Sequence, residues 1–593
     1  MFLSSRISYF LCSCLLVYAS FSFYPKWEKS GGEALISWDV YGYYSYLPAI
    51  FIYKDIKKQV FLDTIVKKYH PADDHKPGYA SKNGNWVMKY SSGMAVVYLP
   101  FFTAANLLAK PLGYPQDGFS LPYQFFIQLG GVLFALIGLW YFRKLLLLFY
   151  NDIVVATCML LLAFGTNYLD YSAIDVGMSH SWLFTIYVFL VLNTVYFYQN
   201  YQYKYAIRIG LLIGLATLIR PTEIIAVLIP LLWGIVHISK ISIKQRLWVL
   251  YTHRKKMFVA FLCAFVIISI QLIYWKYITG NWLVYSYEDQ GFSFKSPHII
   301  EYTFSFDSGW LVYTPIMIFA FIGIIPFLRS GKNKLAILSF FIINYYIICA
   351  WNQWWYGGRA MVQSYPILFF PIASFLNTVL QRKYLLWIVT PIAIVFTYFN
   401  LWYIYQCHTI GFIVPNDYMT NVYFWKVAGR WHVPNDVNKL RYNTDYFEGI
   451  PQNLQLLYSN DFEKDTVYCP FPPVDGKVSL YLDKDHQSTA VYRFPYSIDH
   501  ANWVRAEATF LTINKEWTPW LMPQFIVRFY KGNDIVKERL IRISRFIETG
   551  KTKNIYIDVK IPKENFDSIG ILFLNSDSQK QVLIDNLKVW SFN

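Results

Sequence analysis

The stretch FVAFLCAFVIISIQLIY, residues 258–274, contains no charged side chain. An α-helix rises about 1.5 Å per residue, so a run of this length approaches the thickness of the hydrocarbon core of a bilayer. Comparable runs without charge recur at 310–328 and 384–405. Helices at the surface of a soluble protein are apolar on one face only, so these runs predict a polytopic membrane protein.

The composition agrees with this prediction. The chain has 593 residues, of which 55% are hydrophobic, 20% are aromatic and only 15% are charged. This balance is typical neither of a soluble enzyme nor of a disordered chain, a collagen or a disulfide-rich secreted module.

The formal net charge of +16 has a topological explanation. Residues 451–593 hold 18 basic and 17 acidic side chains, so nearly all of the excess lies in the first 450 residues, in short loops between apolar runs. Basic residues gather in the cytoplasmic loops of membrane proteins, whereas a nucleic-acid partner would require a basic face. The charge therefore indicates topology, and we expect no nucleic-acid partner.

We expect about eleven membrane spans, with the amino terminus inside and with residues 8–24 retained as the first span rather than removed as a signal peptide. This arrangement places in the cytoplasm the basic groups at 143–144, 204–208, 240–256, 329–334 and 382–383. Residues 93–109 are apolar, but a span there would reverse the later loops, so we expect an interfacial or re-entrant element. The predicted spans are 8–24, 123–142, 153–170, 179–198, 205–220, 222–238, 257–277, 309–328, 335–351, 364–380 and 384–404.

Two large segments are then outside the cytoplasm: a first loop at 25–122 and all residues after 405. We expect a membrane domain over 1–405, a linker over 406–450 and an all-β sandwich, similar to a jelly roll, over 451–593. Apolar residues alternate with polar ones at 555–561 and recur at 525, 527 and 529, as in half-buried strands. The segments at 460–463 and 583–589 resemble the first and last strands of carbohydrate-binding jelly rolls.

Six separate outer segments carry acidic, basic or aromatic residues at the predicted membrane boundary, where ionisable groups are costly unless they serve a site. The candidates are Trp38, Asp39, Tyr43, Tyr44, Lys89, Asp175, His180, Arg220, Glu288, Asp289, Trp351 and Arg359. Each also has a structural interpretation, since Trp and Tyr gather at membrane interfaces, Arg220 can reach lipid headgroups and Glu288 and Asp289 can be solvated loop acids.

The membrane domain resembles the GT-C superfamily of integral-membrane glycosyltransferases, in particular the bacterial relatives of protein mannosyltransferases and lipid A aminoarabinose transferases. The resemblance is carried by Asp39 in its Trp/Tyr-rich segment, by KYSSG at 89–93, by LIRPT at 218–222 and by the aromatic and glycine-rich run at 351–359. It implies transfer of a hexose or pentose from a polyprenyl-phosphate donor to an extracytoplasmic glycan, lipid or protein acceptor, with Asp39 as the general base.

The chemistry of such a transfer needs these residue types. A carboxylate takes the proton of the acceptor hydroxyl, and fixed cations stabilise the departing phosphate. We expect Arg359, Lys89 and Arg220 to bind the donor phosphate. For the sugar or the acceptor we expect Asp175, His180, Glu288, Asp289, Trp38, Tyr43, Tyr44 and Trp351.

The sequence identifies no cofactor and no metal ligand, and it leaves a divalent metal open. We expect the protein in a membrane, the bacterial inner membrane by the resemblance, with the active site and the carboxyl-terminal domain on the periplasmic side. Two alternative functions stay open: a glycolipid transporter or flippase, and an envelope protein that binds glycan through its β domain.

Overall fold

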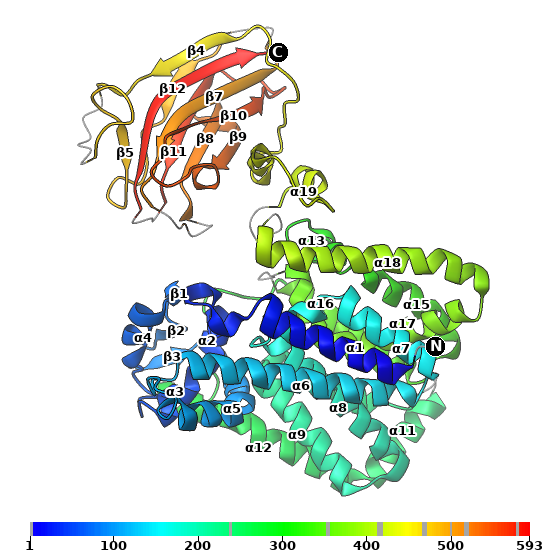
Figure 1. The fold of residues 1–593 in the computed structure, drawn as a ribbon. Coiled ribbons are helices and arrows are strands. Elements are labelled where there is room, and N and C mark those ends of the chain that lie inside the picture. Colours follow the sequence, from blue (N-terminus) through cyan, green and yellow to red (C-terminus); the bar gives the residue numbers. More distant parts are fainter. Residues whose placement is uncertain are drawn as a thin grey trace. The chain divides into compact units, whose positions relative to one another are not determined.

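The computed structural model describes residues 4–235, 240–351, 356–411, 419–464, 471–497, 501–514, 517, 521–576 and 580–593. The chain divides into two compact units, Met1–Ile410 and Gly411–Asn593. The first unit is helical, and the second is built mainly of β-strands (Figure 1). The division is a few residues past the predicted end of the membrane domain at 405.

Among the described residues, six helical segments of the first unit are long and apolar enough to cross a membrane. They are Ser5–Glu28, Leu121–Leu147, Ser179–Asn200, Arg254–Thr279, Gly357–Leu380 and Lys383–Thr409. Within them lie α1 (Ser5–Tyr18), α6 (Leu121–Leu147), α8 (Ser179–Asn200), α12 (Arg254–Thr279), α17 (Tyr365–Leu380) and α18 (Lys383–Tyr405). The protein is therefore a membrane protein with a mostly helical membrane unit.

Shorter apolar helices of 10–17 residues occupy Gly93–Ala109, Asp152–Gly165, Pro221–Leu232, Pro315–Arg329 and Lys334–Ala350. They correspond to α5 (Gly93–Ala109), α7 (Asp152–Gly165), α10 (Leu228–Leu232), α15 (Ile318–Ser330) and α16 (Lys334–Ala350). The remaining helices of the unit after α8 are α9 (Tyr203–Ile219), α11 (Lys240–Thr252), α13 (Ile299–Phe304) and α14 (Trp310–Tyr313).

Two of the predicted spans are not single regular α-helices. In 222–238 the chain forms a 3-10 segment, Pro221–Val227, then the short α10, and leaves the helix at Trp233. In 309–328 a 3-10 turn at Pro315–Met317 separates α14 from α15. Pro221 and Pro315 are the first residues of these 3-10 segments, where a residue that has no N–H to donate leaves no intrahelical hydrogen bond unmade.

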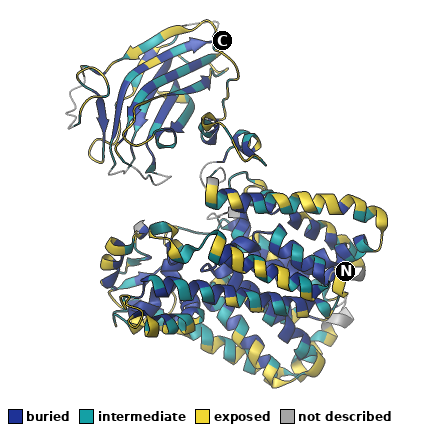
Figure 2. Cartoon of the chain, in the orientation of Figure 1, coloured by how far each residue is buried: buried dark blue, intermediate teal, exposed yellow. Residues whose placement is uncertain are grey.

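Close contacts between small residues hold the bundle together. A Cβ added to Gly210 of α9 would lie 2.1 Å from the carbonyl oxygen of Ala260 on α12, and one added to Gly214 would lie 2.8 Å from that of Ala264. Small residues let helix backbones approach closely where lipid supplies no hydrophobic force between helices. The outer faces of α12 and α18, in contrast, expose large apolar side chains such as Phe261 and Trp387, as the yellow faces in Figure 2 show.

The predicted first loop is a folded layer at one end of the helices (Figure 1). It contains α2 (Trp38–Tyr44), α3 (Tyr46–Phe51), α4 (Phe61–Tyr69), β1 (Pro71–Asp74), β2 (Gly78–Ala80), β3 (Trp86–Met88) and α5. Asp117 secures this layer, because its carboxylate accepts hydrogen bonds from Tyr69 at 2.5 Å and from Lys68 at 2.8 Å. These bonds connect the end of α4 to the segment between α5 and α6.

The second unit contains two antiparallel sheets. One has the order β10-β7-β12-β4 with β5 paired to β12, and the other has the order β6-β11-β8-β9. The strands are β4 (Gln455–Asn460), β5 (Leu480–Leu482), β6 (Tyr492–Pro495), β7 (Trp503–Leu511), β8 (Gln524–Lys531), β9 (Asp534–Arg542), β10 (Lys553–Lys560), β11 (Ser568–Leu574) and β12 (Val582–Phe592).

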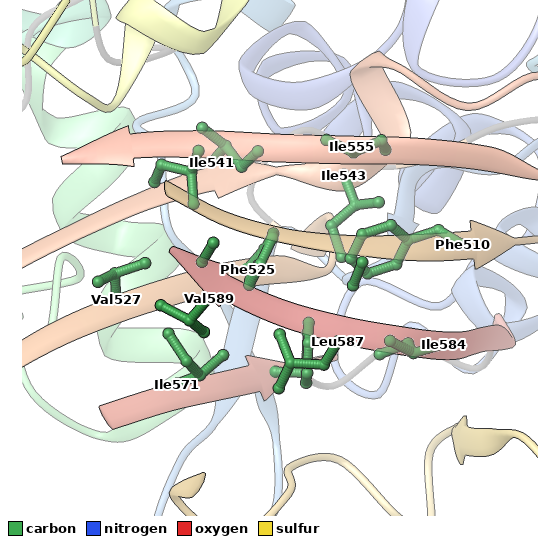
Figure 3. Packing of buried hydrophobic residues seen from close by; sticks show 14 of the residues in the cluster. Phe510, Phe525, Val527, Ile541, Ile543, Ile555, Ile571, Ile584, Leu587 and Val589 are labelled. Atoms are coloured by element: carbon green, nitrogen blue, oxygen red, sulfur yellow. The ribbon is translucent and has the colours of Figure 1, made fainter. Parts of the chain in front are cut away.

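One cluster of buried apolar residues contains side chains from both sheets, among them Phe510, Ile555 and Ile584 of the first and Phe525 and Ile571 of the second (Figure 3). Alternate residues of β10 are buried, which is the period-two pattern that the sequence shows at 555–561. The prediction of a carboxyl-terminal β-sheet region is confirmed.

Two sequence boundaries differ from the structure. The segment 460–463 was expected to open the first strand, but β4 ends at Asn460, so the strand precedes most of it. The predicted linker, 406–450, contains α19 (Asn421–Val427) and a 3-10 segment, Asn435–Arg441, both of which group with the second unit.

Candidate functional site

Asp39 and Tyr43 lie one helical turn apart in α2, so their side chains share a face. The preceding Trp38 has a φ of 47°, a backbone conformation that costs an ordinary residue roughly 1–3 kcal/mol and is concentrated at functional sites.

Arg359 pairs with Asp39 across more than three hundred residues of sequence. The Arg359 Nη2 atom lies 3.0 Å from Asp39 Oδ2, and both side chains are about one quarter exposed, at 24% and 23%. The hydroxyl of Tyr90 donates a hydrogen bond of 2.6 Å to the other oxygen, Asp39 Oδ1. Burial raises the pKa of Tyr90, and Asp39 raises it further, so this hydroxyl stays protonated and remains a donor.

The turn before Arg359 depends on two glycines. Gly357 and Gly358 have φ values of 60° and 64°, in the left-handed region that only glycine adopts freely. Asn167 donates a hydrogen bond of 2.8 Å to the Gly357 carbonyl, and Tyr302 donates one of 3.0 Å to that of Gly358. These bonds fix the backbone that presents the guanidinium to Asp39.

Arg220 and His180 form the second part of the cluster. Arg220 ends α9, and its Nη1 atom lies 3.5 Å from Nδ1 of His180 at the start of α8. The charges of both Arg220 and Arg359 act on His180 and on Tyr43. The structure therefore brings Asp39, Arg359, Arg220 and His180 into one group.

Lys89 approaches this group through aromatic rings. Its Nζ atom lies 5.7 Å from the ring centres of both Tyr90 and Tyr287, within the range of a cation–π interaction. Tyr287 in turn packs edge-on against Trp351, with ring centres 5.4 Å apart. Trp351 thus lies at the edge of the cluster, while residues 352–355 of its motif are outside the described part of the chain.

Trp38 and Tyr44 have contacts outside the Asp39–Arg359 group. The Trp38 indole donates to the Gly32 carbonyl at 3.1 Å, and the Tyr44 hydroxyl donates to the Gly118 carbonyl at 2.5 Å. Both residues belong to α2 but occupy other faces than Asp39, because 3.6 residues complete one turn.

Glu288 and Asp289 are exposed, and neither forms an ion pair with Arg359, Arg220 or Lys89 in the described structure. Asp175 is bound by an ion pair to Lys26, a residue that the sequence analysis does not single out. Burial works to raise the pKa of Asp175, but Lys26 and His408 hold it below its ordinary value, so the carboxylate is ionised and already neutralised.

A second charged group, near the Asp39–Arg359 pair, consists of Lys26, Asp170, Asp175 and His408. His408 Nε2 is 2.7 Å from Asp170 Oδ1, and Lys26 pairs with Asp175, so the end of the first apolar segment, the turn after α7 and the end of the last segment meet here. The position of Lys26 directly after an apolar run was the available sequence signal. Within the described residues, no group of three or more His, Cys, Asp or Glu side chains has a geometry that could hold a metal ion.

Gly93 sets the distance between the Lys89–Tyr90 segment and Arg220. A Cβ at Gly93 would lie 2.3 Å from the Ile219 nitrogen and 2.5 Å from the Ile219 Cα. Both are backbone atoms, so no side-chain rotation can relieve the contact. Alanine is ordinarily the better helix former, so a loss of stability at this position has to come from the steric contact.

Gly93→Ala is expected to lower the free energy of unfolding by about 1–3 kcal/mol, because the added methyl group separates α5 from the end of α9. Thermal unfolding of the detergent-solubilised protein measures it. Gly291→Ala is the matched control, since a Cβ there meets no atom within 4 Å. An unfolding midpoint equal to that of the control would contradict this packing.

Comparison with protein-family models gives no match to this chain, and comparison with curated proteins gives no significant match either. The fold and the charged group define a helical membrane protein with a carboxyl-terminal β-sheet unit and a cluster of ionisable residues assembled from distant segments.

Proposed function

We propose that the protein is a membrane glycosyltransferase that moves a hexose or pentose from a polyprenyl-phosphate donor to an acceptor hydroxyl. The observation that carries the proposal is the pairing of Asp39 with Arg359, at 3.0 Å, beside Arg220 and Lys89. This transfer needs a carboxylate base and phosphate-binding cations within reach of one another.

The Asp39–Arg359 ion pair suggests how binding of the donor phosphate would activate Asp39 as a base. A guanidinium binds phosphate oxygens through two parallel hydrogen bonds, so a donor phosphate competes with Asp39 for Arg359. Asp39 then loses its counter-ion and becomes a stronger acceptor of the hydroxyl proton. Neither Lys89 nor Arg220 forms an ion pair with a described carboxylate, so both charges are available to the same phosphate.

The reaction is a direct displacement at the anomeric carbon. The acceptor oxygen forms a bond to that carbon as its proton passes to Asp39, and the bond from the carbon to the phosphate oxygen breaks with its electron pair on the phosphate. Arg359, Arg220 and Lys89 stabilise the charge that gathers there. Aromatic rings at the edge of the cluster, such as Trp351, supply an apolar face for the sugar.

We also propose the topology of the membrane unit. We take the charged cluster to face the extracytoplasmic side, with about eleven spans and the basic loops in the cytoplasm. The loops predicted to be cytoplasmic support this, because the turn at Phe149–Asn151 and the turn at Gly331–Lys332 line one cavity of about 230 Å³. The second unit, as a two-sheet sandwich, would hold the acceptor in this scheme.

Mass spectrometry of lipids bound to the purified protein tests the proposal, followed by incubation with a synthetic polyprenyl-monophosphate sugar and a total extract of envelope glycans and lipids that supplies the acceptor hydroxyl. We expect the sugar-linked lipid to copurify and turnover to release polyprenyl phosphate. A transporter or flippase would instead return the sugar-linked lipid with its mass unchanged. The absence of both bound donor and released polyprenyl phosphate would overturn the assignment.

A further inference from the structure

A chain of hydrogen bonds runs from Glu223 to His180 inside the helical unit. Gln363 Nε2 donates to Glu223 Oε1 at 2.6 Å, and Gln363 Oε1 lies 3.1 Å from Nδ1 of His180. The Tyr187 hydroxyl donates to the second oxygen of Glu223, also at 2.6 Å. All four side chains are at least 98% buried.

The residues come from three separate elements. His180 and Tyr187 belong to α8, Glu223 to the 3-10 segment after Arg220, and Gln363 to the turn that also carries Arg359. The sequence analysis identifies neither Glu223 nor Gln363 as a candidate. No periodic pattern connects the two, because they are 140 residues apart.

The direction of the chain fixes the proton on the imidazole. Glu223 accepts hydrogen bonds from both the Tyr187 hydroxyl and Gln363 Nε2, so the amide of Gln363 presents its NH₂ group to Glu223 and its oxygen to His180. If Nδ1 carried no proton, two acceptors would face each other at 3.1 Å. Reversing the amide would direct its oxygen at the carboxylate, at 2.6 Å.

Arg220 offers the competing interaction, since its Nη1 atom could donate to Nδ1. That separation of 3.5 Å is at the outer limit for a hydrogen bond, whereas the bond between Gln363 and Glu223 is short. The charges of Arg220 and Arg359 both act on the ring, and they repel a third positive charge placed there. The ring edge of Tyr171, with its centre 5.4 Å away, adds no charge.

We propose that Glu223 is a positioning residue that, through Gln363, holds neutral His180 with its proton on Nδ1 and leaves the lone pair of Nε2 to accept a hydrogen bond from a sugar hydroxyl. The role in sugar binding rests on the proposed glycosyltransferase function. No hydrogen bond to Nε2 occurs within the described residues, so the lone pair is available to a ligand.

The test reads the tautomer directly, by ¹⁵N NMR of the full-length protein labelled at histidine, in detergent micelles and without substrate. The His180 signals are those lost in His180→Gln. We expect the wild-type ring to be in the Nδ1–H form. Glu223→Gln should give a mixture of tautomers and lower kcat/KM for the polyprenyl-monophosphate sugar about tenfold, the effect of roughly one hydrogen bond.

Two further variants separate positioning from general structural damage. The exchange Glu223→Gln/Gln363→Glu places a carboxylate next to Nδ1 and should restore the Nδ1–H form. Tyr187→Phe removes the other hydrogen bond to Glu223 and should leave the tautomer unchanged.

A wild-type ring in the Nε2–H form would overturn the proposal, and so would a Glu223→Gln ring that stays fully Nδ1–H. If Glu223→Gln does not fold, the tautomer of the wild type and that of the exchange variant still test the proposal. The NMR readout needs no turnover, so a protein with the expected tautomer and no sugar transfer would refute the proposed function and leave the hydrogen-bond chain established.

Discussion

Asp39→Asn is expected to lower the turnover of donor by a factor of about 10²–10⁴, the usual contribution of a general base. The amide is nearly isosteric with the carboxylate and can still accept from Tyr90, which donates to Asp39 at 2.6 Å. It cannot take a proton from an acceptor hydroxyl. Single-turnover measurements, with the protein in excess over the polyprenyl-monophosphate sugar and with acceptor present, isolate this effect on the chemical step.

Donor binding should respond in the opposite direction. Asp39 neutralises Arg359 at 3.0 Å, and removing that charge leaves the guanidinium available to the donor phosphate. We therefore expect the affinity of Asp39→Asn for the donor to be equal to or higher than that of the wild type, as measured by equilibrium binding to the protein in nanodiscs. This combination of lost turnover and retained affinity is specific to a base.

Asp63→Asn is the matched control, because Asp63 pairs with Lys76 in the same folded layer and its side chain is 54% exposed. An exposed pair contributes about 1 kcal/mol or less, so turnover should not change. Asp39→Asn within tenfold of wild-type turnover would exclude a base at this position. Loss of turnover together with loss of donor binding would indicate a structural role for Asp39.

The sequence predicts the members of the cluster better than it predicts their orientation. Asp39, Arg220 and Arg359 are predicted because each belongs to a segment that the threading places at the outer membrane boundary, where an ionisable group is costly unless it serves a site, and because each belongs to a motif that resembles the GT-C superfamily. Their meeting in space follows from the threading, which puts those segments on one side.

The orientation of neighbouring residues needs helical phase, which the sequence analysis did not assign to the segment at 37–48. Tyr43 shares a face with Asp39 because α2 is a helix, and the same geometry turns Trp38 and Tyr44 toward Gly32 and Gly118. The pairing of Asp175 with Lys26 also escaped prediction, because a residue just past the first span carries no information about which later loop it contacts.

Chains of hydrogen bonds between buried polar side chains are the hardest feature to predict from the sequence. The sequence does not show that Glu223 and Gln363 are partners. Only the fold shows that the amide of Gln363 donates the hydrogen bond that the buried carboxyl group of Glu223 accepts. The interrupted segments around Pro221 and Pro315 have the same origin, since hydropathy measures how apolar a run is and not whether its helix is regular.

Arg359→Gln is expected to reduce kcat/KM for the donor by a factor of about 10²–10³, the range for loss of a group that stabilises developing charge. The reason is the loss of the two-pronged contact to the phosphate together with the loss of the counter-ion of Asp39. Arg359→Lys keeps the charge but not the planar fork, so its activity should lie between those of Arg359→Gln and the wild type. Steady-state kinetics with the same synthetic donor give both values.

Arg382→Gln provides the matched control for the charge, because Arg382 is an exposed residue at the start of α18. Its removal should leave kcat/KM unchanged. A similar fall in both variants would mean that Arg359 acts only through the overall charge of the protein.

The double variant Asp39→Asn/Arg359→Gln tests whether the two residues act as one unit. Residues in direct contact have non-additive effects, and groups that serve the same step lose little more together than the worse one loses alone. We therefore expect the double variant to be about as active as the less active single variant. If the two losses multiply, the base and the phosphate-binding cation act independently. The idea that the donor phosphate draws Arg359 away from Asp39 would then be wrong.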